Sequence, residues 1–405
     1  MIGLAALARL FWLGDMEFKS DEREWVDTLV NVWSRPLSPF APESHHSGIP
    51  HSSAFFHFLR AVSFASNDPL VMVGSIAGLT AGVMLLGLVL GRGSKMDLLA
   101  LAMMGTSLTL FVNTRKIWTP DLIVAWVILG LVLWSAAERN RAPRVAAWLT
   151  FASAFCFVMA PHMYLAALPA AVAVTVAVPV LWLWRRRAHP GRARFRAWVL
   201  GVLAGWATFV PYVVARCCAT ASPRNHPPLL ARELGEAVLD AFTLPSPLKV
   251  YLVYLSDPAQ ALRAQGSSHL LDLTLLWTLI AVVVWTTLFA AVLVRLLIRW
   301  RQTLDSPMVV ASLLAWLGTT AGILSSRLGS YINYWVAAVP FVYFLMAHTA
   351  YRARRSRCFR FLRPALWVAC VVALITTAHF ALLIHENRGF PGEYGTSYDR
   401  QQRQP

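Results

Sequence analysis

The stretch Leu70–Gly91, LVMVGSIAGLTAGVMLLGLVLG, contains no charged residue and is followed directly by Arg92 and Lys95. A helix of about 20 apolar residues crosses the roughly 30 Å hydrocarbon layer of a bilayer, so this stretch predicts a transmembrane helix. Over the whole chain 57% of the residues are hydrophobic and 14% are charged. No soluble core needs so much apolar surface, and we therefore predict an all-α, polytopic integral membrane protein.

The same reading, continued along the chain, predicts ten membrane spans and a partial eleventh. The ten are Leu70–Gly91, Met96–Val112, Asp121–Ala137, Val145–Ala160, Met163–Trp184, Trp198–Ala215, Leu273–Ile298, Met308–Leu324, Tyr331–Ala350 and Ala365–Ile384. The partial span, Ile2–Leu13, would reach only about 21 Å as a helix, which is short of the hydrocarbon thickness. It has no basic segment before it and no small-residue cleavage site after it, so we expect a shortened first helix rather than a signal peptide.

Arginine placement predicts the orientation of these spans. Short, arginine-dense loops alternate with segments that hold most of the acids, and the arginine-dense loops of a membrane protein stay in the cytoplasm. The arginine-dense loops are Arg92–Lys95, Arg139–Arg144, Arg185–Arg196, Arg295–Arg301 and Arg352–Arg363; the other set is Asp15–Pro69, Asn113–Pro120, the turn at Pro161 and His162, Cys217–Asp272, Ser325–Ser330 and the tail after His385. This predicts a multi-pass protein of a bacterial-type inner (cytoplasmic) membrane, with a cytoplasmic N-terminus and an extracytoplasmic C-terminus.

The charge of the chain follows from this topology. The formal net charge of +16 would suit nucleic-acid binding, but the basic residues sit where the topology signal needs them, so no nucleic-acid partner is expected. Cys156 and Cys370 fall in predicted spans and Cys358 in a cytoplasmic loop, which argues against a disulfide framework.

The predicted organisation is one transmembrane domain, residues 1–384, and a polar tail, residues 385–405. Two outer loops, residues 15–69 and 217–272, are long enough to contain interfacial helices. We expect one at Ala54–Phe64, with Phe55, Phe56, Phe58 and Leu59 buried in the membrane surface, and another at Leu229–Phe242. The tail is too short to be a folded domain, and either covers the mouth of a site or is disordered.

The chemistry-bearing candidates are acids on the extracytoplasmic side. Asp21 and Glu22 are adjacent in the first outer loop, and Asp121 opens a span after Thr119 and Pro120. A carboxylate at the start of a helix is also typical of a solvated N-terminal cap that interacts with the helix dipole. The functional interpretation depends on several such groups collecting on one side of the membrane.

Three local patterns carry a resemblance to a known family: RLFWLGDMEFKSDEREW at residues 9–25, NTRKIWTPDLIVAW at residues 113–126, and SYINYWVAAVPFVYFLMAHTAYR at residues 330–352. In order and sidedness they resemble the GT-C superfamily of polyprenyl-phosphate-sugar glycosyltransferases, the group of protein O-mannosyltransferases and aminoarabinose transferases. The resemblance implies a membrane enzyme of the cell envelope that transfers a sugar from a polyprenyl-phosphate donor, with inversion, to a lipid, glycan or protein acceptor.

The resemblance also implies residue roles. Asp21 would be the general base with Glu22 beside it, Asp121 would be a second acid, and Tyr331 and Tyr334 would contact substrate. Four side chains would bind the donor phosphate: Arg115, Lys116, His162 and Arg327. The family often has Lys where this chain has His162, and aminoarabinose transferases have Arg where this chain has Glu24, so transfer of another sugar is favoured.

No cofactor is firmly indicated. Glu43, His45, His46 and His51 are suitable ligand types for a divalent metal, with Glu43 and His46 as the candidate ligands, but their spacing matches no fixed motif. A polar loop beside the site is the alternative interpretation.

Two other functions remain open at this point: a transporter or flippase for a lipid-linked or envelope component, and a noncatalytic GT-C-like subunit. Transporters usually place ionisable residues near the bilayer midplane, whereas the acids here collect at one face. That distribution favours an enzyme working at the membrane boundary.

Overall fold

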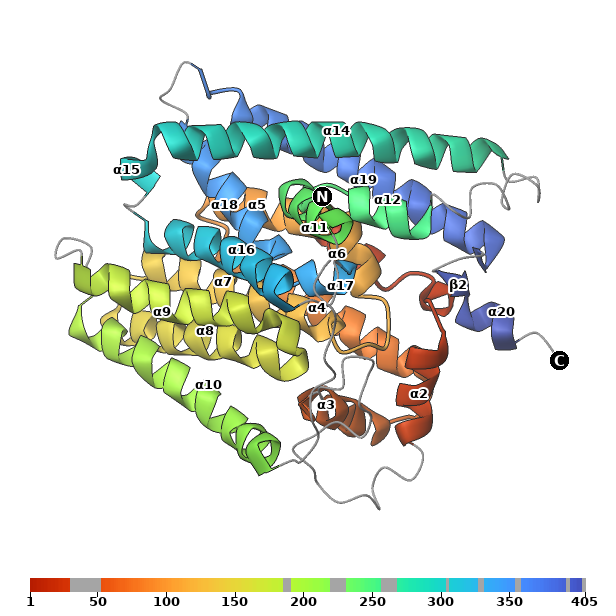
Figure 1. Ribbon diagram of the computed structural model, residues 1–405, viewed down its shortest axis with the longest axis horizontal. Helices are drawn as coiled ribbons and strands as arrows, with labels where there is room; N and C mark the ends of the chain where they lie inside the picture. The colour runs from red at the N-terminus through yellow and green to blue at the C-terminus, as the bar shows by residue number, and fades with distance from the viewer. Residues whose placement is uncertain are drawn as a thin grey trace.

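The chain folds into a bundle of helices whose long members run roughly parallel to one another (Figure 1). The computed structural model describes residues 1–29, 52–184, 191–218, 231–255, 268–303, 306–326, 331–353, 358–390 and 394–402. The predicted all-α, polytopic membrane class is confirmed. Within the described residues, eight helices are long and apolar enough to cross a membrane. They are α4 (Pro69–Leu90), α7 (Asp121–Arg139), α8 (Pro143–Met163), α9 (Leu168–Trp184, preceded by the 3-10 turn η3, Leu165–Ala167), α10 (Arg192–Cys218), α14 (Ser268–Ile298), α16 (Pro307–Ser326) and α19 (Leu362–Asn387).

The two ends of the bundle differ. The arginine-rich end carries α15 (Trp300–Thr303) and the C-terminal ends of α7 and α18 (Val339–Arg352). The opposite end, here called the acidic end, carries α2 (Ser20–Leu29), loop 114–120, α12 (Leu248–Tyr254) and residues 389–390 and 394–402 of the tail. Helices α15 and α2 lie at opposite sides of the view in Figure 1.

Two predicted spans are not continuous helices. The Met96–Val112 span divides at Ser107 into α5 (Lys95–Thr106) and α6 (Leu108–Asn113), where the extended backbone of Ser107 (ψ 118°) interrupts the helix. The Tyr331–Ala350 span divides into α17 (Ile332–Trp335), a turn, and α18, which has Pro340 in its first turn. At about 1.5 Å per residue, neither α5 nor α18 is long enough to cross the hydrocarbon layer.

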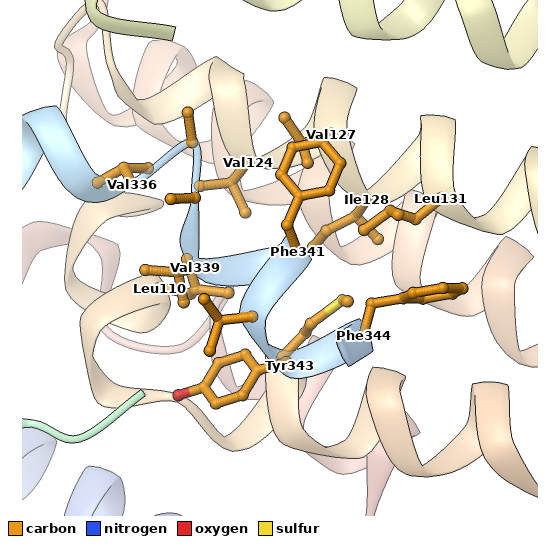
Figure 2. Packing of buried hydrophobic residues seen from close by; sticks show 14 of the residues in the cluster. Leu110, Val124, Val127, Ile128, Leu131, Val336, Val339, Phe341, Tyr343 and Phe344 are labelled. Atoms are coloured by element: carbon orange, nitrogen blue, oxygen red, sulfur yellow. The ribbon is translucent and has the colours of Figure 1, made fainter. Parts of the chain in front are cut away.

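Helix α18 is apolar because it is surrounded by protein. Every residue from Val339 to Ala350 is buried. Figure 2 shows Phe341 and Phe344 of α18 among Val127, Ile128 and Leu131 of α7. A helix that is hydrophobic on all sides belongs either in lipid or in a protein core, and composition does not distinguish the two.

A polar cluster fastens these central helices at the arginine-rich end. Asp97 of α5 accepts a hydrogen bond from Ser135 of α7 (2.6 Å) and pairs with Arg139 of the same helix. Nε2 of His348 in α18 lies 3.8 Å from Oδ1 of Asp97. The cluster therefore joins α5 to α7 through an ion pair and a hydrogen bond, and it brings His348 of α18 close to the same carboxylate.

The first helix is shorter than predicted, because α1 (Ile2–Ala8) ends before Arg9. The Arg9 side chain is fully buried, and its guanidinium donates hydrogen bonds to the carbonyls of Ala5, Gly105 and Met104 and to Thr114 Oγ1. Arg9 thus satisfies the free carbonyls at the end of α5, which the break at Ser107 leaves without helical partners.

The loop helices exist, with one correction. Helix α3 (Ala54–Ser63) buries Phe55, Phe56 and Leu59 against protein, not in the membrane surface. Phe55 packs edge-on against Trp25 of α2, with 5.1 Å between ring centroids. In the segment predicted to be the second outer loop, α11 (Ala231–Thr243) occupies most of the predicted helix. An amphipathic helix next to a bundle can satisfy its apolar face with protein or with lipid, and its sequence is the same in both cases.

The pair of helices α8 and α10 provides a stability test. A Cβ atom added at Gly201 of α10 would overlap the backbone oxygen of Phe151 in α8, whereas one added at Gly78 of α4 would meet nothing within 4 Å. We expect Gly201→Ala to push the helices apart and to lower the free energy of unfolding by about 1–3 kcal/mol. The measurement is thermal unfolding in detergent, with Gly78→Ala as the matched control. Equal midpoints for the two variants would contradict the close packing at Gly201.

Candidate functional site

Lys116 is the centre of a buried polar cluster at the acidic end. It lies in loop 114–120 between α6 and α7. Its ammonium pairs with Glu17 and donates a hydrogen bond to the hydroxyl of Tyr254 at 2.7 Å. Burial alone would lower the pKa of Lys116, but the charges of Glu17, Tyr254 and Glu22 raise it well above its usual value. Lys116 is therefore held as a cation inside the protein.

Three buried carboxyl groups surround this cation: Glu17, Glu22 and Asp121. Glu22 of α2 accepts a hydrogen bond from the backbone N–H of Lys19 at 2.9 Å. Burial and the neighbouring Glu17 raise the pKa of Glu22 to about 7. Glu17 also pairs with the partly exposed Lys19 at 2.5 Å. The cluster thus encloses more acids than cations, which favours a protonated carboxyl group within it.

Asp121 lies at the first turn of α7 and is fully buried. Its Oδ2 accepts a hydrogen bond from the backbone N–H of Trp118 at 3.0 Å. Among the residues that the structure describes, its Oδ1 has no hydrogen-bond partner. The alternative of a solvated cap is therefore wrong: Asp121 is enclosed by protein, and its hydrogen bond reaches back to loop 114–120 and not to the first turn of α7.

The structure brings together Glu22, Lys116 and Asp121 from the predicted site, since the charges of Lys116 and Glu22 both act on Asp121. Asp21 lies in α2 next to Glu22, but its side chain is not among those described. Glu17 and Tyr254 are additions that the sequence reasoning missed. The signal for Glu17 was present as the alternating acids in Gly14–Lys19, GDMEFK, whereas nothing near Tyr254 in the sequence indicates a site.

A second group of polar side chains adjoins the Lys116 cluster. Nδ1 of His385, in the last turn of α19, lies 2.8 Å from Oδ2 of Asp15, and its ring stacks on Trp12 with 4.3 Å between centroids. Arg115 donates hydrogen bonds to the carbonyls of Phe11 (2.7 Å) and Trp12 (2.5 Å). Arg115, a predicted phosphate ligand, is thus engaged with the backbone of residues 11 and 12, and burial lowers its pKa.

The C-terminal tail packs against the Asp15–Phe18 segment. It contains β1 (Gly389–Phe390), β2 (Gly395–Thr396) and α20 (Tyr398–Gln402). The hydroxyl of Tyr394 donates to the carbonyl of Asp15 at 2.5 Å, Ser397 forms a β-bridge with Glu17, and Gln401 donates to the carbonyl of Phe18 at 2.5 Å. The strands β1 and β2 pair antiparallel.

The remaining predicted residues have other neighbours or are not described. His162 contacts α10, with Nε2 3.1 Å from Thr208 Oγ1 and 3.3 Å from the Gly205 carbonyl, so it takes part in helix packing. Tyr331 is exposed and lies edge-on to Tyr334, which stacks on Tyr164 at 6.1 Å. Arg327, Glu43, His45, His46 and His51 belong to segments outside the described residues. Within the described residues, no group of three or more His, Cys, Asp or Glu side chains could hold a metal ion.

The pKa of Glu22 predicts a pH dependence of stability. An unfolded glutamate has a pKa near 4.5, against about 7 for Glu22 in the fold. Between these values the folded state holds a proton that the unfolded state releases, so folding is favoured at low pH and this contribution is lost as pH rises toward 7. Over this window the free energy of unfolding of wild type should fall by about 3 kcal/mol relative to that of Glu22→Gln.

Thermal unfolding of both proteins from about pH 3.5 to about pH 8 measures the difference. Below this window the difference between the two unfolding midpoints should be constant. Within the window the midpoint of wild type should fall relative to that of Glu22→Gln. Glu24→Gln, an exposed residue of the same helix, is the control. A constant difference across the whole range would show that Glu22 ionises as it does in water.

When the chain was compared with protein-family models, curated proteins and solved structures, no match was found.

Proposed function

We propose that the protein is an integral membrane glycosyltransferase that transfers a sugar from a polyprenyl-phosphate donor to an acceptor at the extracytoplasmic face. The observation that carries the proposal is the buried cluster of Lys116 with Glu17, Glu22 and Asp121 at the acidic end. The resemblance of the two motifs at residues 9–25 and 113–126 to the GT-C superfamily adds to it. These motifs are far apart in the sequence, yet together they supply all four groups of the cluster.

The chemistry suits this set of groups. A polyprenyl phosphate is already a good leaving group, so the protein must mainly bind the phosphate and accept one proton from the attacking hydroxyl or amine. An ammonium ion shielded from water binds a phosphate strongly. We infer that Lys116 exchanges its partner Glu17 for the donor phosphate, and that Glu17 keeps its second cation, Lys19.

The orientation of the protein in the membrane is a part of this proposal. With the arginine-rich end in the cytoplasm, the cluster would lie at the outer boundary of an inner membrane, within reach of lipid, glycan or protein acceptors. Tyr331 and Tyr334 would offer aromatic surface to a sugar. Asp21 stays the sequence-based candidate for the general base, and Glu22 beside it is enclosed by protein.

The first experiment tests the function as a whole. Membranes from a deletion strain and from the same strain expressing the protein are supplied with a labelled lipid extract that contains polyprenyl-phosphate sugars. We expect labelled glycolipid, glycan or glycoprotein only where the protein is present. Movement of the labelled lipid across the membrane without a transferred sugar would instead indicate a transporter.

The second experiment tests Lys116. Lys116→Met should lower transfer about 100- to 1000-fold, because removing one preorganised group that stabilises developing anionic charge costs that much. Lys95→Met, an exposed lysine at the arginine-rich end, should retain activity. Since Lys116→Met leaves Glu17 buried without its cation, the double variant Glu17→Gln/Lys116→Met checks that lost activity is not lost folding. Wild-type transfer by the folded double variant would contradict the phosphate role.

A further inference from the structure

His385 is held in one orientation by two different interactions. Its Nδ1 lies 2.8 Å from the Asp15 carboxylate, and its ring is nearly parallel to that of Trp12, with 11° between the planes. The His385 side chain is 46% exposed, while that of Asp15 is 6% exposed. A half-exposed imidazole is thus fixed by a buried carboxylate behind it.

The backbone that carries Trp12 is strained. Trp12 has φ 50° and ψ 48°, the left-handed conformation that a bulky residue rarely adopts. Such a conformation is unfavourable and persists only where surrounding contacts enforce it. Here Arg115 binds the carbonyls of residues 11 and 12, and the Tyr394 hydroxyl binds the carbonyl of Asp15. Strain of this kind at a fixed imidazole points to a functional site.

The hydrogen-bond network assigns the tautomer. A carboxylate at Nδ1 accepts the N–H at that position, so the neutral ring has its free electron pair on Nε2. Besides His385, the charged groups Arg115 and Asp399 act on the Asp15 carboxylate. An imidazole with Nδ1–H on a buried acid and Nε2 available is the arrangement of a general base.

The imidazole adjoins the Lys116 cluster. Arg115 and Lys116 are consecutive, and Asp15 is two residues before Glu17. Tyr394, which binds the Asp15 carbonyl, also packs against Tyr254, the hydrogen-bond partner of Lys116, with 5.9 Å between ring centroids. Glu22 and Asp121, by contrast, are enclosed by protein. Among these groups, His385 is the proton acceptor that a bound acceptor molecule can reach.

We propose that His385 and Asp15 form the acid–base dyad of this site, with His385 as the general base and Asp15 as its positioning residue. The inference rests on the proposed sugar transfer. Nε2 takes the proton of the acceptor hydroxyl, the acceptor oxygen bonds to the anomeric carbon, and the bond from that carbon to the phosphate oxygen breaks. The electron pair stays on the phosphate, which Lys116 neutralises, and the imidazolium releases its proton to water.

The test combines activity with a measurement that does not depend on activity. In the transfer assay, His385→Gln should be 10²- to 10⁴-fold slower than wild type and should lose the fall in rate at acidic pH. His269→Gln, an exposed histidine at the start of α14, should match wild type in both respects. Wild-type activity of folded His385→Gln overturns the dyad while sugar transfer stands.

The second measurement is nitrogen NMR of the protein with ¹⁵N-labelled histidine in lipid nanodiscs, with His385→Gln assigning the signal. Neutral His385 should be a single Nδ1–H tautomer in wild type and a mixture in Asp15→Asn. A mixture in wild type overturns the dyad whatever the activity. If wild type shows the single tautomer but transfers no sugar, the proposed function fails and the Asp15–His385 geometry is supported.

Discussion

The ion pair between Glu17 and Lys116 is the interaction on which the acidic end depends. Both side chains are buried, and removing two charges from water costs several kcal/mol for each ion unless they meet each other and additional hydrogen-bond partners. Tyr254 supplies one such partner. The pair therefore fixes loop 114–120 against the N-terminal segment, and it holds Glu22 and Asp121 near a cation that neither would otherwise reach.

The same end of the molecule is closed by the chain's two termini. The Asp15–Phe18 segment contributes acids to both polar groups, and residues 394–402 bind its backbone from the other side. Arg9 anchors the turn between α1 and this segment to α5, and Arg115 anchors residues 11 and 12 of that turn to loop 114–120. The cost of the left-handed Trp12 is thus offset by contacts from elements distant in sequence.

The sequence predicted much of the fold because the free energy of placing a segment in lipid depends mainly on the composition of that segment. A run of apolar residues crosses lipid wherever it occurs, so most spans were found within a few residues of their observed bounds. Met96–Val112 and Tyr331–Ala350 were wrong as continuous spans because a helix enclosed by protein has the same apolar composition as one enclosed by lipid. For the same reason, Phe55 and Leu59 were assigned to the membrane surface although protein covers them.

For the candidate site, the sequence by itself determined which segments carry acids and cations on one side of the bundle, because charge is excluded from the spans. It thereby identified Glu22, Lys116 and Asp121. Only the tertiary structure decided that Glu17 neutralises Lys116, that Tyr254 completes the pair, and that Asp15 meets His385 across the whole length of the chain. Such pairings depend on which helix ends become neighbours, and that is set by packing in the bundle, which no local pattern records.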